Sequence, residues 1–223
     1  MPGGGSGDFS LSCAKEDFKF SSAHFVSHGG GREMLHGHNY RVYVSLQGTS
    51  LGAEGVVMDF SELKRVVRAL CKCVAGRGLR WGVAARARRD PTFLTQHTPP
   101  QTHARPAREL DEKFLCPMAS TTCLPTVLEK QVELRVVGDG TFFSLPRGDV
   151  LCLPLANTTV EELSMYLAQR IVAGLGRGRL GECGIHSVTV GVTETPGQEC
   201  RYTVSGAGGA AAGGAGAASG PLG

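Results

Sequence analysis

Three histidines occur at spacings that suit a metal site. His36 and His38 are separated by one residue, Gly37, and His24 lies upstream of both. Because side chains alternate along a strand, His36 and His38 share one face, and Gly37 allows close backbone approach. If the strand that carries His24 pairs with this one, three neutral imidazoles converge and leave a fourth position open, as in a catalytic zinc site. The pattern predicts a metalloenzyme in which Zn²⁺ acts as a Lewis acid on a substrate oxygen.

Length and composition are those of one globular domain. The chain has 223 residues, of which 41% are hydrophobic, and no apolar run approaches the roughly 20 residues of a membrane helix. Residues 1–12 are rich in Gly and Ser, without an apolar signal core or an Arg-rich amphipathic pattern. The eight cysteines are scattered and include no CxxC pair, so reduced thiols are expected. These features predict a cytoplasmic protein with no membrane partner.

The net charge of +3 is concentrated in one segment. Residues 75–108 contain seven arginines and one aspartate, a local charge of +6 that leaves −3 elsewhere. The segment has no sustained hydrophobic period and contains Pro99-Pro100, which predicts a long flexible insertion. A nucleic-acid partner is not expected, because the insertion offers only Trp81 and Phe93 for stacking and no basic stripe on a folded face.

Alternating apolar residues predict strands on both sides of the insertion. The hairpin turn is expected at Gly138-Asp139-Gly140. The predicted strands are Phe18–Phe25, His38–Gly48, Glu129–Val137, Thr141–Leu145, His186–Thr195 and Cys200–Val204.

Two helices are predicted from apolar residues at helical spacing. Each follows a possible capping box, Asp59 with Glu62 in the first case and Thr159 with Glu162 in the second. Strands joined by short turns form an antiparallel sheet, with the helices on one face, so we expect a single α+β domain over residues 13–204. Residues 1–12 and the Gly/Ala-rich residues 205–223 are expected to be disordered.

Six sequence blocks resemble the family of 6-pyruvoyltetrahydropterin synthase and 6-carboxytetrahydropterin synthase. They occur in the family's order and cover nearly all of the ordered chain outside the insertion and part of the hairpin region. The blocks are Phe20-Ser21-Ser22-Ala23-His24, Leu35-His36-Gly37-His38-Asn39-Tyr40, Gly55-Val56-Val57-Met58-Asp59-Phe60 with Leu63-Lys64, Leu110-Asp111, Asn157-Thr158-Thr159-Val160-Glu161, and Thr193-Glu194-Thr195 with Tyr202.

The resemblance implies a fold, an assembly and a set of site residues. The fold would be the tunnelling fold, whose units of four strands and two helices assemble into trimers and then hexamers, so a homo-oligomer is expected. The family's zinc ligands correspond to the three histidines. Its pterin anchor corresponds to Glu194, whose carboxylate would accept two parallel N–H bonds from the guanidine-like edge of the ring. Thr158 and Thr159 would supply further hydrogen bonds to the pterin.

Two positions depart from the family pattern. Members that release triphosphate from 7,8-dihydroneopterin triphosphate carry a catalytic cysteine shortly before HGH, whereas this chain has Glu33 there, giving ExxHGH. This resembles a branch of the family that cleaves the side chain to give 6-hydroxymethyl-7,8-dihydropterin, a folate precursor. The family's Asp-His pair is Asp111-Glu112 here. Asp111 therefore remains a candidate catalytic residue, but Glu112 cannot replace the imidazole.

A carboxylate at position 33 could still act as a general base. Such a role contributes roughly 10²–10⁴ in rate when the base is well placed, although a nearby cation lowers the pKa of a carboxylate. Retro-aldol cleavage needs only deprotonation of a hydroxyl and a stabilised carbanion, which suits a carboxylate beside zinc.

The resemblance therefore implies a zinc-dependent, 6-pyruvoyltetrahydropterin synthase-like lyase, of the carbon–oxygen, phosphate-eliminating kind. It would convert 7,8-dihydroneopterin triphosphate in tetrahydropterin or folate biosynthesis, and Glu33 favours side-chain cleavage to 6-hydroxymethyl-7,8-dihydropterin. Two alternatives remain open. One is a catalytically silent pterin- or metal-binding homologue, and the other is a 6-carboxytetrahydropterin synthase.

Overall fold

The computed structural model describes residues 7–28, 30–71 and 110–208. The predicted insertion at 75–108 and most of the predicted disordered termini lie outside these residues. None of the described helices has the length and apolar character needed to span a membrane. In chain order the elements are β1 (Phe9–His24), β2 (Ser27–His28), β3 (Gly31–Arg32), β4 (His36–Gly48), α1 (Phe60–Cys71), β5 (Lys113–Pro117), β6 (Cys123–Val127), β7 (Gln131–Val136), β8 (Phe142–Pro146), the 3₁₀ turn η1 (Arg147–Asp149), β9 (Val150–Leu153), α2 (Val160–Leu175), α3 (Arg177–Glu182), β10 (Ile185–Thr195) and β11 (Gln198–Ser205).

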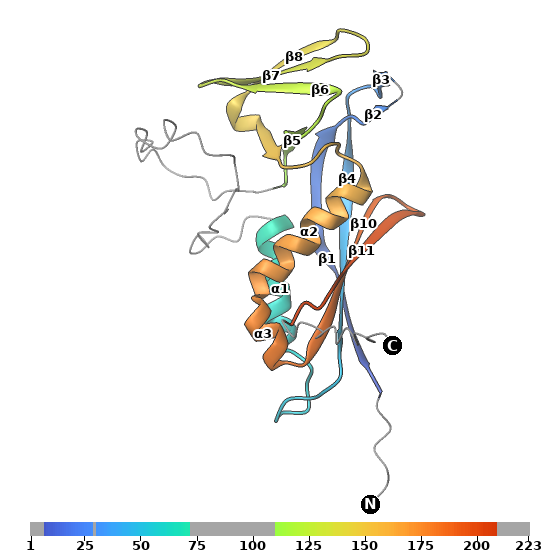
Figure 1. The fold of residues 1–223 in the computed structure, drawn as a ribbon, viewed down its shortest axis with the longest axis vertical. Helices are drawn as coiled ribbons and strands as arrows, with labels where there is room; N and C mark the ends of the chain where they lie inside the picture. Colours follow the sequence, from blue (N-terminus) through green and yellow to red (C-terminus); the bar gives the residue numbers. More distant parts are fainter. Residues whose placement is uncertain (1–6, 29, 72–109, 209–223) are drawn as a thin grey trace, which may run out of the picture.

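One long sheet forms the spine of the molecule. Its strand order is β11-β10-β4-β1-β5-β9, and the first four strands are antiparallel neighbours. Helix α1 packs on β1, and α2 packs on β10 and β11, on the same side of the sheet (Figure 1). The expected unit of four antiparallel strands and two helices, the tunnelling fold, is confirmed. Strands β5 and β9, which the sequence analysis did not predict, extend the sheet by parallel pairing.

Alternation along β4 separates the core from the open face of the sheet. Tyr40, Val42, Val44 and Leu46 are almost completely buried, whereas Arg41 and other alternate residues reach the open face. This is the period of two expected for a strand with one covered face. The buried side chains meet the apolar stripes of both helices in the main core. Because His36 and His38 belong to the same alternation, β4 directs both imidazoles toward the helix side.

The capping of α2 follows the predicted pattern only in part. The Thr159 hydroxyl accepts a hydrogen bond from the Glu162 backbone N–H at 3.4 Å, as expected for an N-cap. The Glu162 carboxylate, however, accepts from the backbone N–H of Ala156 at 2.7 Å. In a capping box it would return to the cap residue itself. Glu162 therefore orders the segment that enters the helix, which contains Thr158.

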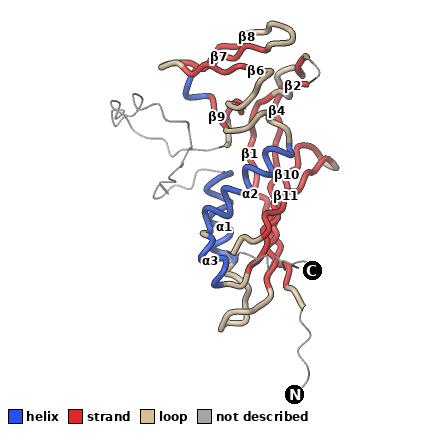
Figure 2. Tube along the Cα trace, viewed as in Figure 1, coloured by secondary structure: helices blue, strands red, loops and turns tan. Residues whose placement is uncertain are grey.

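A second, three-stranded sheet caps one end of the molecule (Figure 2). Its order is β6-β7-β8, and β7 and β8 form the predicted hairpin around Gly138-Asp139-Gly140. Strand β6 was not predicted. The sheet covers a separate apolar cluster that includes Phe25, Phe114, Val132 and Leu134. Phe25 directly follows His24, so this second core holds the chain where it leaves the end of β1.

Two boundaries differ from the expected ones. Residues 9–12 were expected to be disordered, but β1 begins at Phe9 and pairs with β4 along this stretch. A polar strand is stable here because its backbone hydrogen bonds are supplied by β4. At the other end, disorder was expected from Ser205. Instead Ser205 ends β11, and Ala207 is buried with its N–H donating to the His186 carbonyl at 3.1 Å.

Candidate metal centre and active site

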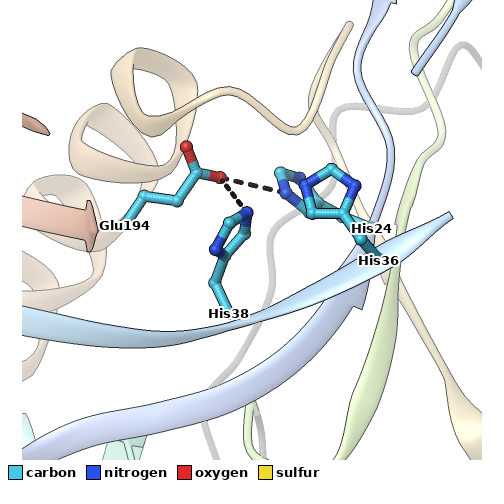
Figure 3. A group of neighbouring side chains, drawn as sticks. All are labelled: His24, His36, His38 and Glu194. Atoms are coloured by element: carbon cyan, nitrogen blue, oxygen red, sulfur yellow. Dashed lines mark ion pairs between the residues drawn. The ribbon is translucent and has the colours of Figure 1, made fainter. Parts of the chain in front are cut away.

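The three predicted histidines meet at one point. In the β1–β4 ladder His24 lies opposite His36, and Ser22 lies opposite His38. The ring centroids are 4.8 Å apart for His24 and His36, 5.3 Å for His24 and His38, and 4.6 Å for His36 and His38. Glu194, from β10, joins them, and one potential ligand atom from each of the four residues lies within 4.8 Å of the others (Figure 3). The predicted pairing of the His24 strand with the HxH strand is thus present.

Backbone carbonyls fix the orientation of two of the imidazoles. His24 Nδ1 lies 3.0 Å from the carbonyl oxygen of Thr158, and His36 Nδ1 lies 2.7 Å from that of Met34. Because a carbonyl oxygen only accepts hydrogen bonds, each Nδ1 must carry the proton in these contacts. The other ring nitrogen, Nε2, then presents its lone pair. This is the usual arrangement around a metal-binding histidine.

His24 is held in the neutral form that binds metals. Its side chain is fully buried, and burial lowers its pKa, although the nearby charge of Glu194 acts in the opposite direction. Its Nε2 is buried and makes no hydrogen bond of acceptable geometry with any described residue, even though Glu194 Oε1 is 3.0 Å away. Leaving such an atom without a partner costs about 1–3 kcal/mol. A bound cation would remove this cost.

Glu194 adds an oxygen and a negative charge to the cluster. Its Oε1 lies 3.0 Å from His24 Nε2 and 3.3 Å from His38 Nε2, and it accepts a hydrogen bond from the Tyr40 hydroxyl at 3.3 Å. A nitrogen lone pair that faces a carboxylate is repelled unless a proton or a cation lies between them. Three imidazole nitrogens are a ligand set that suits a catalytic Zn²⁺, and the carboxylate beside them adds a favourable negative charge. The residues present therefore fit the predicted metal.

Tyr40 is a site residue that the sequence analysis missed. The pKa of its hydroxyl is raised, first by burial and then by the negative charge of Glu194 and the hydrogen bond to it. The negative charge of Glu33 acts in the same direction. Tyr40 therefore stays protonated and donates to Glu194. Its position two residues after His38, on the same face of β4, was the available signal.

Thr158 and Thr159, predicted to bind the pterin, are both engaged with the protein. The buried Thr158 hydroxyl donates to the Phe25 carbonyl at 3.0 Å, while its own carbonyl holds His24. Thr159 caps α2. Thr158 thus lies directly behind the candidate metal site and positions His24 through its Nδ1.

Glu33 lies in the short connection before His36 and is exposed. Its N–H donates to the Val26 carbonyl at 2.9 Å, and its Oε2 accepts from the Val26 N–H at 3.2 Å. Within the described part of the chain its carboxylate pairs with no cation. The adjacent Arg32 instead pairs with Asp139, at 3.3 Å. The carboxylate of Glu33 is therefore not neutralised by its neighbour.

Asp111 is not among the donors gathered at the histidines. Its Oδ1 accepts from the Ser21 backbone N–H at 2.8 Å, and the next residue, Glu112, donates from its N–H to the Ser21 carbonyl at 2.7 Å. The Ser21 side chain bonds Asn39, which alternates with the histidines on β4 and so lies on the open face. A cavity of about 410 Å³ on this side is lined in part by Ser21, Asn39 and Glu112. Within one chain, the structure does not bring Asp111 to the His24 cluster.

Comparisons with known proteins agree with this architecture. Residues 13–205 match the family model described as 6-pyruvoyl tetrahydropterin synthase. A Methanocaldococcus jannaschii protein, provisionally named a 6-carboxy-5,6,7,8-tetrahydropterin synthase, is 27% identical over 184 residues, which cover 82% of this chain and 88% of the relative.

Solved structures show the same fold. The 6-pyruvoyl tetrahydropterin synthase of Plasmodium vivax superposes with a TM-score of 0.70 at 24% identity, covering 89% of this chain and 99% of that one. The Plasmodium falciparum enzyme gives 0.69 at 24% identity, with 89% and 98% covered. Two further P. vivax structures are variants in which a catalytic glutamate is replaced by alanine or by cysteine. On the extent of the family match, the chain belongs to the 6-pyruvoyl tetrahydropterin synthase family of pterin lyases.

Proposed function

We propose that this protein is a zinc-dependent lyase that acts on 7,8-dihydroneopterin triphosphate. The observation that supports this most directly is the convergence of His24, His36, His38 and Glu194, with His24 Nε2 buried and without a hydrogen-bond partner among the described residues. When bound, the ion supplies Lewis-acid polarisation of a substrate hydroxyl. The protein's residues do the rest: they orient the pterin, remove a proton and keep the imidazoles in place.

Glu33 is the proposed general base. Its carboxylate is exposed, is oriented by the Val26 N–H, and is free of any ion pair with the described cations. The P. vivax relative has a catalytic glutamate, which supports the use of a carboxylate in this fold. In the proposed reaction Glu33 removes the proton of the hydroxyl on the second side-chain carbon, and the bond between the first and second side-chain carbons breaks. The second and third carbons leave as an aldehyde that carries the triphosphate, and the carbanion on the first carbon, stabilised by the pterin ring, takes the proton back from Glu33. The product would be 6-hydroxymethyl-7,8-dihydropterin.

Glu194 is the proposed pterin anchor, with Tyr40 holding its carboxylate. A carboxylate that accepts two N–H bonds from the guanidine-like edge is a strong, oriented contact. Thr158 supports the site through its contact with His24, and Thr159 through the capped start of α2. Asp111 is a less direct candidate, since it serves the reaction only if another part of the assembly brings it to the substrate. We also propose a cytoplasmic homo-oligomer, a trimer or hexamer, as the family resemblance implies.

Two alternatives make different predictions. A silent homologue would bind the pterin or the metal without turnover, a possibility favoured by Glu112 in place of the family's histidine. A 6-carboxytetrahydropterin synthase is suggested by the name of the M. jannaschii relative. The possibilities differ in product: a 6-hydroxymethyl or 6-pyruvoyl pterin from the lyase, a 6-carboxy pterin from the synthase, and no product from the silent homologue.

The test is to incubate zinc-loaded protein with 7,8-dihydroneopterin triphosphate and to identify the product by mass. Glu33→Ala should lower the turnover rate by roughly 10²–10⁴, the usual contribution of a general base. Glu54→Ala, in an exposed loop, serves as the matched control and should behave as the parent. Pterin binding without product would select the silent homologue, and unchanged turnover in Glu33→Ala would exclude Glu33 as the base.

A further inference from the structure

Arg32 joins the loop that carries Glu33 to the second sheet. Its Nε lies 3.3 Å from Asp139 Oδ2, and its Nη2 donates to the Thr141 hydroxyl at 3.4 Å. Both partners belong to the β7–β8 turn. The Arg32 side chain is only 15% exposed, which is unusual for an arginine unless its charge is compensated.

The same guanidinium also contacts Glu33 directly. Arg32 Nη1 donates to the backbone carbonyl of Glu33 at 2.9 Å. Its Cζ lies 5.0 Å from the ring centroid of Phe143 and 5.7 Å from that of Phe25, within the range of cation–π attraction. Arg32 therefore touches the hairpin, the end of β1 and the backbone of Glu33 at the same time.

The contacts of Arg32 determine which interactions remain available to the Glu33 carboxylate. Asp139 compensates the positive charge of Arg32, so this charge does not pair with the side chain of Glu33. On its other side Glu33 exchanges hydrogen bonds with Val26 through its own N–H and its Oε2. Glu33 is thus held from both sides, and its second carboxylate oxygen makes no hydrogen bond with any described residue.

The two turns also fit closely against each other. A Cβ atom at Gly138 would overlap the carbonyl oxygen of Gly30. Only a residue without a side chain allows this approach. The glycine therefore places Asp139 where it can reach Arg32.

We propose that Arg32 is a positioning residue for Glu33, and that the β7–β8 turn belongs to the catalytic apparatus through the Asp139–Arg32 pair. This inference rests on the proposed role of Glu33 as base. In this role the Arg32 guanidinium acts through Glu33 and not on the substrate. It fixes the backbone of Glu33 and keeps its own charge away from the Glu33 carboxylate.

The kinetic test is a double-mutant cycle. Arg32→Ala should lower kcat by about 10²-fold, the effect of misplacing a catalytic group by about 1 Å, with little change in KM. In the Glu33→Ala background the same substitution should have no further effect, because residues that act through one group are not additive. Arg135→Ala, an exposed arginine on β7 of the same sheet, is the matched control. Additive losses, or a loss confined to KM, would overturn the proposal.

Two more conservative variants test the proposal in case Arg32→Ala does not fold. Arg32→Lys keeps the charge but not the planar fork, so it should retain an intermediate kcat. Asp139→Asn removes the charge while keeping an oxygen for the Thr141 N–H, which Asp139 Oδ1 binds at 2.8 Å. It should resemble Arg32→Ala in kcat and the parent in melting temperature. Full activity in both would contradict the positioning role.

Hydrogen exchange tests the inference without any turnover. The backbone amides of Val26 and Glu33 should lose protection in Arg32→Ala and keep it in Arg135→Ala. If the parent protein shows no lyase activity, the proposed function fails, but this measurement still decides whether Arg32 holds Glu33. Unchanged protection at both amides would overturn the inference.

Discussion

Glu194→Gln separates two roles that one carboxylate could have at this site. In the structure Oε1 faces His24 Nε2, His38 Nε2 and the Tyr40 hydroxyl. No described residue hydrogen-bonds Oε2. If Glu194 anchors the pterin, Gln at this position keeps the shape but offers one acceptor where the ring edge presents two donors. If Glu194 instead binds the metal, the substitution removes a charged ligand.

The size of the expected effect follows from the lost hydrogen bond. A hydrogen bond to a charged group contributes about 1.5–3 kcal/mol. The Glu194 side chain is 21% exposed, so water compensates part of the loss, and the lower half of that range applies. A loss of about 2 kcal/mol corresponds to a rise in KM of about 30-fold. The zinc content should stay the same, because the three imidazoles remain.

The assay combines steady-state kinetics with metal analysis of the same protein samples. KM and kcat are measured with 7,8-dihydroneopterin triphosphate, and zinc affinity by competition with a chelating dye. Glu54→Gln, in an exposed loop, is the control and should change neither. Loss of zinc from Glu194→Gln with an unchanged KM in the remaining loaded fraction would refute the anchoring role and make Glu194 a metal ligand.

Three further outcomes are expected. Thr158→Val removes the hydroxyl that donates to the buried Phe25 carbonyl, so the free energy of unfolding in urea should fall by about 1–3 kcal/mol. Thr158→Ser keeps a hydroxyl and should retain most of the parent's stability. Equal stability of the two variants would contradict this account. Dialysis against a chelator should abolish turnover and lower the melting temperature. Adding Zn²⁺ at 100 times its Kd should restore about 2.7 kcal/mol of stability. A melting temperature that does not change with zinc would argue against a metal site. Leu134→Ala, at a fully buried position of the second core, should lower the free energy of unfolding by about 2–5 kcal/mol. Leu124→Ala, at a position on β6 that is 47% exposed, should change it by less than about 0.5 kcal/mol. Similar losses for both variants would mean that the cluster is not packed as described.

The histidine cluster could be predicted because its geometry is largely local. His36 and His38 share a face through strand alternation alone, and His24 is only one strand away. The four antiparallel strands and both helices carry clear periodic patterns. What the sequence could not provide was the approach of distant backbone groups: the Thr158 carbonyl behind His24 has no signature in composition or spacing.

The unpredicted strands show a different limit. Strands β5 and β9 have five and four residues, too few for a period to emerge, and they pair in parallel between segments far apart in the chain. Their existence depends on tertiary pairing and not on local preference. For the same reason the surroundings of Asp111 could not be derived from its motif. Its motif was recognisable, but the direction in which the chain presents it depends on where β5 joins the sheet.

The Thr158–His24 contact makes the orientation of one candidate metal ligand depend on a distant part of the chain. These residues are 134 positions apart, so the entropy cost of closing a long loop must be met before they can touch. An ion can therefore be captured tightly only once α2 has settled against the end of the first strand. If a zinc-sensitive fluorophore is mixed with refolding protein, its signal should follow the last step of folding and not the first collapse of the chain.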